Sequence, residues 1–232
     1  MTTCSPFKYF KTSPEIIRLA VMYYIRYPLS FRQVEDILHE RGVDICHETV
    51  RFWVERFGSK FAREIRKNRA GQHSNWQWHL DKVFVKINGE RFYLWRAVDH
   101  EGEVLEAFVS KRRCKRTALK FIKKMMKKYC NPHEIVTDKL ASYGAALNTL
   151  GAKQLQNTTQ YHNNRSEKSH LPFRRRERAM QKFRSAATLQ RFATVHGSIY
   201  NHFNHERHLE IRQVYKQKRA AALTEWRKIC AA

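Results

Sequence analysis

Three amphipathic helices are predicted between residues 13 and 57. Ser13-Pro14-Glu15 is a typical helix start, because it combines a capping side chain, a proline in the first turn and an acid at the positive end of the helix dipole. Ser30 and Gln33 have the spacing of a capping box before the second helix. The third helix is predicted from about Cys46 to Phe57, and residues 58–75 are predicted to form a basic helical extension and then a linker, with 71–75 as the boundary. Helices joined by a short glycine-containing link are typical of a helix-turn-helix, although a plain three-helix bundle would give the same pattern.

The hydrophobic pattern changes to a period of two after Trp76. Residues 78–87 and 91–98 are predicted to form strands, and Asn88-Gly89 between them indicates a tight hairpin turn. A third strand is predicted at 104–110. Beyond it the pattern predicts helices at 115–129, at 142–150, from about Asn164 and at 188–203, with a short strand at 134–138. Strands that alternate with helices after a three-strand meander predict an α/β domain with a mixed sheet.

The pattern divides the chain into three parts. Residues 1–70 are predicted to form the helix-turn-helix domain. Residues 76–205 are predicted to form the α/β domain, after a link rich in turn-forming residues. Residues 206–232 are predicted to form a basic helical tail.

Composition changes the picture most through charge. Lys and Arg number 45 against 21 Asp and Glu, so the net charge is +24. Such an excess favours a polyanionic partner. Nucleic acid is preferred over membrane, because no run of about 20 apolar residues is present. Five scattered cysteines without a C-x-x-C pair argue against a disulfide framework or a zinc site. Without an apolar leader, we expect a cytoplasmic, nucleoid-associated protein.

Three acids are candidates for chemistry. Asp81 lies inside a predicted strand, where a carboxylate is costly unless it is paired or binds a metal. Asp138 follows a second strand, at the end where open α/β sheets bind ligands, and Glu167 begins a helix. Brought together, the three would repel one another unless cations neutralised them. Mg²⁺ prefers oxygen ligands, and two such ions can stabilise both the attacking and the leaving oxygen of a phosphoryl transfer.

Each acid also has a plainer interpretation. Asp81 would be a paired core acid, Asp138 a turn cap and Glu167 an acid at a helix start. Taken singly these interpretations are favoured, and the metal site gains its support from the three acids together with the helical domain and the charge. Rival acids are Asp99 and Glu101, which lie in a predicted turn, and Glu177.

Basic residues suggest where DNA would bind. His47 and Arg51 lie on the predicted exposed face of the third helix, within reach of base edges or phosphates. Arg174, Arg178 and Lys182 follow Glu167 at helical spacing and could hold phosphates, although a solvated basic face explains them equally well.

These motifs together resemble the DDE transposases of bacterial insertion sequences, and insertion-sequence family six in particular. The resemblance implies a ribonuclease-H-like catalytic domain and a DDE triad that holds two Mg²⁺ ions, with Mn²⁺ as an alternative. It implies binding to double-stranded DNA, at terminal inverted repeats and at a target, by a homodimer or higher oligomer. Mapped onto matching positions, the triad is Asp81, Asp138 and Glu167. The motifs are Trp78-His79-Leu80-Asp81, 93–99, Thr137-Asp138-Lys139 with Ser142-Tyr143-Gly144, and 163–167 with Ser169-His170.

The chain departs from the family pattern at four positions. Lys82 stands where an acid is usual, and Lys168 where a non-basic residue is common. Cys114 and Cys130 stand where an acid and a glycine are expected. Strand alternation predicts that Lys82 points away from Asp81 and leaves the metal site undisturbed. These departures leave a rival open: a catalytically inactive DNA-binding regulator, or a decayed transposase copy.

Overall fold

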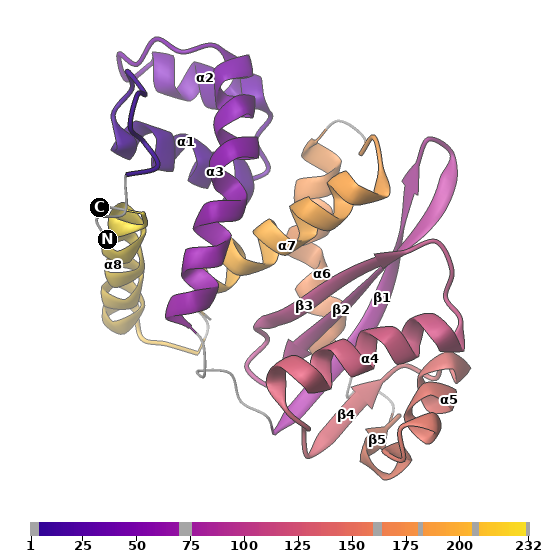
Figure 1. Cartoon of the computed structure of the whole chain (residues 1–232). Helices are drawn as coiled ribbons and strands as arrows, with labels where there is room; N and C mark the ends of the chain where they lie inside the picture. The colour runs from indigo at the N-terminus through magenta and orange to yellow at the C-terminus, as the bar shows by residue number, and fades with distance from the viewer. Residues whose placement is uncertain (1–4, 70–75, 160–163, 181–182, 206–208, 231–232) are drawn as a thin grey trace. The chain divides into compact units, whose positions relative to one another are not determined.

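A computed structural model of the chain describes residues 5–69, 76–159, 164–180, 183–205 and 209–230, without the side chains of 164–168 (Figure 1). The chain forms two compact units. The first combines residues 1–69, 175–181 and 198–232, and the second combines residues 70–174 and 182–197. The N-terminal helices and the C-terminal segment therefore share a unit, although they lie at opposite ends of the sequence. The link predicted at 71–75 lies outside the described residues.

The first unit opens with the three expected helices, α1 (Pro14–Arg26), α2 (Phe31–His39) and α3 (His47–Asn68). Ser13 caps α1, and both hydrogen bonds of the predicted capping box are present at α2. Helix α3 continues without a break into the predicted helical extension and ends at Asn68, eleven residues after Phe57. Its extension buries Phe61, Ala62 and Ile65, which gives it an apolar face of its own.

The C-terminal helix α8 (Arg212–Lys228) completes this unit. The buried Arg18 of α1 donates a hydrogen bond of 2.7 Å from Nε to the Ile229 carbonyl. In return, Trp226 donates to the Arg18 carbonyl at 3.2 Å, and its ring lies 5.5 Å from that of Phe61. These contacts join α8 to α1 and α3.

The end of helix α6 (Asn164–Ala179) also belongs to the first unit. Arg176 is buried, and its Nε donates a hydrogen bond of 2.6 Å to the Tyr24 carbonyl in α1. Its guanidinium lies 4.0 Å from the centre of the Tyr24 ring. Burial lowers the pKa of Arg176 to about 10, so the side chain stays charged at neutral pH. The contact with the ring partly offsets the cost of burying that charge.

The second unit is built on a five-stranded mixed sheet in the order β3-β2-β1-β4-β5. Strands β1 (Gln77–Ile87), β2 (Glu90–Asp99) and β3 (Val104–Ser110) form the predicted antiparallel meander. Asn88 and Gly89 form the predicted hairpin turn with φ of 50° and 82°. The short strands β4 (Glu134–Thr137) and β5 (Gln156–Asn157) run parallel to β1.

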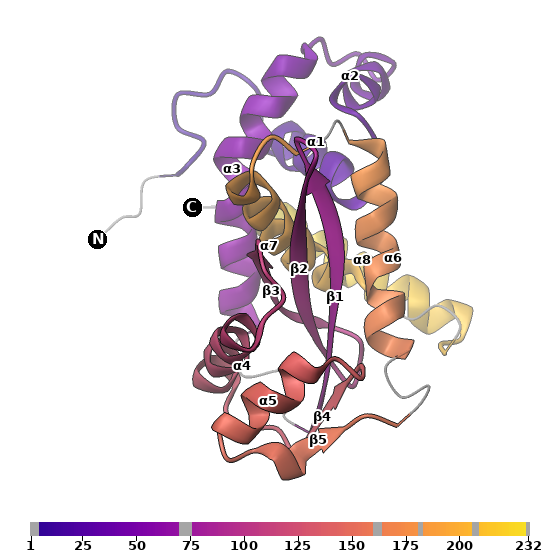
Figure 2. The same cartoon turned by 90° about the vertical axis from the view of Figure 1, so that its right-hand side faces the viewer.

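Helices cover both faces of this sheet. Helices α4 (Lys115–Tyr129) and α5 (Ala141–Thr149) pack on one face, where Phe121 and Tyr143 join Trp78 and Trp95 in the main core. A 3-10 turn, η1 (Lys153–Leu155), leads into β5. Helix α6 begins on the opposite face (Figure 2). This architecture confirms the predicted α/β fold, a ribonuclease-H-like mixed sheet with helical segments before it.

Helix α7 (Ala186–Phe203) protects the edge strand β3. The backbone N–H of Val109 donates to Gln190 Oε1, and Gln190 Nε2 donates to the Ala107 carbonyl, both at 2.8 Å. The amide thus satisfies strand groups that would otherwise be open to pairing with another chain. Among the described residues, no helix is long and apolar enough to cross a membrane.

Candidate active site

Two of the predicted acids meet where β1 lies beside β4. The two strands run parallel, and their last register pair joins Leu80 to Thr137. Asp81 and Asp138 follow directly, so the spacing of neighbouring strands puts their Cα atoms about 5 Å apart. The short β4 ends at this point because Asp138 begins a turn, in which its Oδ1 accepts a hydrogen bond of 3.2 Å from the Leu140 N–H.

Lys82 lies on the face opposite Asp81, as predicted, but it contacts the other aspartate, so the prediction that it leaves the site undisturbed was wrong. Its Nζ forms an ion pair with Oδ2 of Asp138. Strand alternation does turn Lys82 to the face opposite Asp81, because its cross-strand partner is the core residue Trp95. Asp138, however, lies one residue beyond its strand, where alternation no longer fixes the direction of a side chain. A long lysine side chain on either face can therefore reach it.

Asp81 contacts a histidine from α6. His170 Nε2 lies 3.1 Å from Asp81 Oδ2, and both side chains are largely buried. The distance is that of an ion pair, but the alignment falls short of a hydrogen bond. Burial lowers the pKa of His170, and this effect outweighs the opposing attraction of Asp81. A neutral imidazole next to Asp81 does not itself compensate the negative charge of that carboxylate.

Arg96 fixes the start of α6 above the sheet. It is the cross-strand partner of Asp81 and is 2% exposed. Its Nη1 donates a hydrogen bond of 2.8 Å to the Ser169 carbonyl, and its guanidinium lies 5.9 Å from the centre of the Phe173 ring. Ser169 comes two residues after Glu167 in the same helix. The backbone of α6 that carries Glu167 is thereby tied to the strand pair that carries Asp81.

A buried hydroxyl lies close to both aspartates. Tyr143 in α5 is fully buried, and its hydroxyl has no hydrogen-bond partner among the described residues. Burial raises the pKa of Tyr143 well above its usual value, and the negative charges of Asp81 and Asp138 raise it further. The phenol therefore keeps its proton, and a ligand at the two aspartates would provide a hydrogen-bond acceptor.

The donor set suits a hard divalent cation, although it is incomplete in the described part of the chain. Asp81 and Asp138 offer only oxygen atoms, which Mg²⁺ prefers. Among the side chains that the structure describes, no group of three or more His, Cys, Asp or Glu residues could hold a metal ion. Glu167 lies in the first turn of α6, but its side chain lies outside the described residues.

Asp99, one of the rival acids, has a structural role, and so has Glu106, a further buried acid of the sheet. Asp99 is fully buried, and its Oδ1 accepts hydrogen bonds from the N–H groups of Glu101 and Glu103 at 3.0 and 2.9 Å. It therefore holds the turn between β2 and β3. Glu106 pairs with Lys124 at 3.4 Å and with Lys128 at 3.2 Å on α4.

Three basic residues after Glu167 were predicted to hold DNA phosphates, and one of them, Arg174, has a described contact within the protein. Its Nη2 donates a hydrogen bond of 2.7 Å to the Phe84 carbonyl, so it is tied to β1. Arg178 is exposed and belongs to the first unit, whereas Arg174 belongs to the second. Lys182 lies outside the described residues.

The start of α3 is held by an acid from α2. Glu35 Oε2 accepts from both the backbone N–H and Nδ1 of His47, each at 2.9 Å. Arg51 lies 3.4 Å from Glu48 and stacks over Phe31 at 5.3 Å. Both predicted DNA-binding side chains are only partly exposed and already have partners within the unit.

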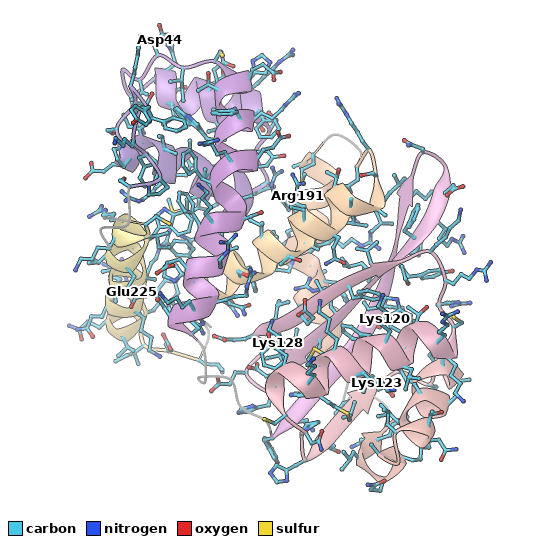
Figure 3. The ribbon with its side chains drawn as sticks, viewed as in Figure 1. Asp44, Lys120, Lys123, Lys128, Arg191 and Glu225 are labelled. Atoms are coloured by element: carbon cyan, nitrogen blue, oxygen red, sulfur yellow. The ribbon has the colours of Figure 1, made fainter. Side chains whose placement is uncertain are left out.

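The outer side of α4 forms a further basic surface in the second unit. Lys120, Lys123 and Lys127 are exposed along the helix. Figure 3 labels Lys120, Lys123 and Lys128 on α4, and the Nζ atom of Lys120 lies 5.6 Å from the centre of the Phe108 ring in β3. Lys124 and Lys128 are partly neutralised by Glu106.

The family motifs in the sequence include His170, Arg96 and Tyr143, but sequence reasoning gave no role at the acids to His170 or Arg96 and treated Tyr143 as a positioning or core residue. His170 follows Glu167 by three residues, a spacing that puts both on one face of a helix, and this was a usable signal. Arg96 and Tyr143 gave no such signal, because their importance depends on pairing between strands and on burial.

Comparison with known proteins places the chain in a family. A family profile described as a DDE domain matches residues 75–206, more than half of the chain. The transposase for the insertion sequence-like element IS431mec of Staphylococcus aureus strain Mu50 is 32% identical over 185 residues, which cover 78% of this chain and 82% of that protein. The transposase for insertion sequence element IS257 in transposon Tn4003 of Staphylococcus aureus has the same identity and coverage.

A solved structure with some similarity is that of the simian T-cell lymphotropic virus intasome in complex with PP2A regulatory subunit B56 gamma. It is 18% identical with a TM-score of 0.43, and the match covers 61% of this chain and 54% of that one. The fold assignment rests instead on the strand order and helix placement described above.

The profile match and these relatives define the class: a transposase with a DDE domain. The chain belongs to the DDE transposases of insertion-sequence family six.

Proposed function

We propose that this transposase cuts the ends of its element and joins them to target DNA by Mg²⁺-dependent chemistry at Asp81, Asp138 and Glu167. The observation that carries the proposal is the register of β1 and β4, which makes two of these acids neighbours. Among the described residues, Lys82 forms an ion pair with Asp138, and His170 lies 3.1 Å from Asp81. Membership of the DDE family supports Glu167 as the third acid.

Asp81, Asp138 and Glu167 would hold the divalent ions. When bound, such ions neutralise charge on the scissile phosphate and favour ionisation of an attacking water. In the first step a water oxygen forms a bond to phosphorus, and the bond to the 3′-oxygen breaks, which frees a 3′-hydroxyl. In the second step the oxygen of that hydroxyl forms a bond to the phosphorus of a target phosphodiester, and the bond from this phosphorus to the target's own 3′-oxygen breaks, which leaves a 3′-hydroxyl on the target strand. No covalent bond between protein and DNA is needed.

Other residues of this chain orient the acids. His170 limits the rotation of the Asp81 carboxylate, and Arg96 holds the turn of α6 that follows Glu167. Arg174, Arg178 and Lys182 are proposed to contact phosphates of the bound DNA. These contacts would fix the position of the backbone without reading sequence.

Helices α1 to α3 are proposed to recognise the terminal inverted repeats, with His47 and Arg51 on the recognition helix. The partner would be double-stranded DNA at the element ends and at the target, and the active form a homodimer or higher oligomer. The net charge of +24 supports a polyanionic partner. We propose the domain limits 1–70, 76–205 and 206–232 for truncation experiments. Because α8 packs on α1, a fragment of residues 1–70 would lose the hydrogen bonds between Arg18 and the C-terminal segment.

Nicking of a duplex that carries the element's terminal repeat tests the proposal. We expect the full chain to nick that duplex in Mg²⁺, to leave it intact in EDTA and to bind it more tightly than a random duplex. Specific binding without nicking in Mg²⁺ or Mn²⁺ would instead identify a catalytically inactive DNA-binding regulator.

A further inference from the structure

One candidate metal ligand already holds a cation from the protein itself. Lys82 Nζ forms an ion pair with Asp138 Oδ2, and the lysine side chain is 13% exposed. The two residues come from adjoining segments of one unit, namely β1 and the turn after β4. The ammonium therefore lies at one of the two aspartates, where a divalent ion would otherwise supply the positive charge.

Displacing this lysine would be costly. If the carboxylate partner of a largely buried ammonium is taken away, the free energy of the folded protein rises, because the charge is then neither hydrated nor paired. A divalent ion that took over both oxygens of Asp138 would have to overcome this cost. An ion that left the Lys82 contact in place would avoid it.

The charges of the three acids are balanced when one divalent ion binds and Lys82 stays in contact with Asp138. Asp81, Asp138 and Glu167 carry three negative charges when ionised. One divalent ion together with the Lys82 ammonium supplies three positive charges, whereas two divalent ions with the ammonium would supply five. Crowding of like charges raises the free energy of the second arrangement before any DNA phosphate is present.

We propose that Lys82 serves as the second cation of this site, so that the protein alone binds one divalent ion and not two. This inference rests on the proposed function, because it takes Asp81, Asp138 and Glu167 as the metal ligands. Lys82 is then a positioning residue: it holds Asp138 in place and sets the number of ions bound.

Counting Mn²⁺ ions tests the inference without any measurement of cleavage. The full chain, free of DNA, is titrated with Mn²⁺, and free Mn²⁺ is measured by its electron paramagnetic resonance signal. We expect one tightly bound ion in the natural chain and two in Lys82→Met. Lys86→Met is the matched control, because Lys86 lies exposed on the same strand, and it should bind one ion.

The outcomes separate this inference from the proposed function. Two ions in the natural chain, or one ion in folded Lys82→Met, would overturn the role of Lys82 and leave the metal site standing. No bound Mn²⁺ in the natural chain or in either variant would overturn both proposals. If Lys82→Met fails to fold by circular dichroism, Lys82→Gln replaces it, and the count for the natural chain still decides.

Discussion

Cys130 lies in a backbone conformation that residues with a side chain rarely adopt. It follows helix α4 with φ of 62° and ψ of −171°, a region that is occupied almost only by glycine. The resemblance to the family predicted a glycine here, and the backbone supplies the physical reason. The chain turns sharply between α4 and β4, and the backbone conformation of this turn is strained for any residue that has a Cβ.

Cys130→Gly should therefore stabilise the protein. Release of the strain outweighs the greater flexibility that glycine gives the unfolded chain, so we expect a gain of about 1 kcal/mol in the free energy of unfolding. Urea denaturation measures the gain. Cys130→Ala is the matched control, because it keeps the Cβ and removes only the thiol. Equal stability of the Gly and Ala variants would refute the strain.

Lys82 shows where residue-level reasoning fails. The alternation of the strand correctly turned its Cβ away from Asp81. It said nothing of a flexible side chain that reaches an acid just beyond a neighbouring strand. That contact depends on the end of β4, which the sequence located only to within one residue.

The two ends of helix α3 differ in what their side chains contact. Its first turns carry the predicted DNA-binding residues, and its later turns pack against α8 through Phe61 and Trp226. The sequence pattern located the first part through the link before it. The second part was predicted only as a basic helical extension, because its apolar partner lies at the far end of the chain.

Arg51→Ala should weaken binding to the terminal repeat if the start of α3 is the recognition helix. Loss of a base contact would lower affinity for that duplex by about 1–3 kcal/mol and affect a random duplex less. Gel-shift titrations at fixed salt measure both affinities. Arg63→Ala removes a charge from an exposed position later in the same helix, and it should leave the preference unchanged. Unaltered affinity in Arg51→Ala would exclude the assignment.

Element prediction succeeded where the signal was local. Capping residues set the starts of α1 and α2, and Asn88-Gly89 set the first hairpin. It could not foresee that Arg176, in a run of basic residues, is buried against α1. Nor could it foresee that α8 packs with α1 and α3. Both features depend on contacts between residues far apart in the chain.

At the scale of the whole molecule, buried histidines couple stability to pH. Burial lowers the pKa of His170, His202 and His205. In the unfolded chain each titrates near its ordinary value of about 6.5. As the pH falls, the unfolded chain therefore takes up protons first. Stability is fully present above about pH 6.5 and is lost as the pH drops below it.

The free energy of unfolding should accordingly be lower at pH 5.5 than at pH 7.5. His202→Gln should reduce this difference, because His202 Nε2 is buried and donates to the Ala222 carbonyl at 2.8 Å. His39→Gln, at an exposed position, should behave like the natural chain. Urea titrations at both pH values give the comparison. A pH difference unchanged by His202→Gln would rule out this coupling.

The catalytic role of the acids is the central claim for the whole molecule. The most direct test is the single-turnover rate of Mg²⁺-dependent nicking on a terminal-repeat duplex, measured for Asp81→Asn, Asp138→Asn and Glu167→Gln. Each variant should lose at least about a hundredfold in rate and still bind the duplex. Asp99→Asn, which alters the turn acid, should nick at close to the natural rate despite lower stability. A nicking rate near the natural one in any of the three acid variants would contradict the claim.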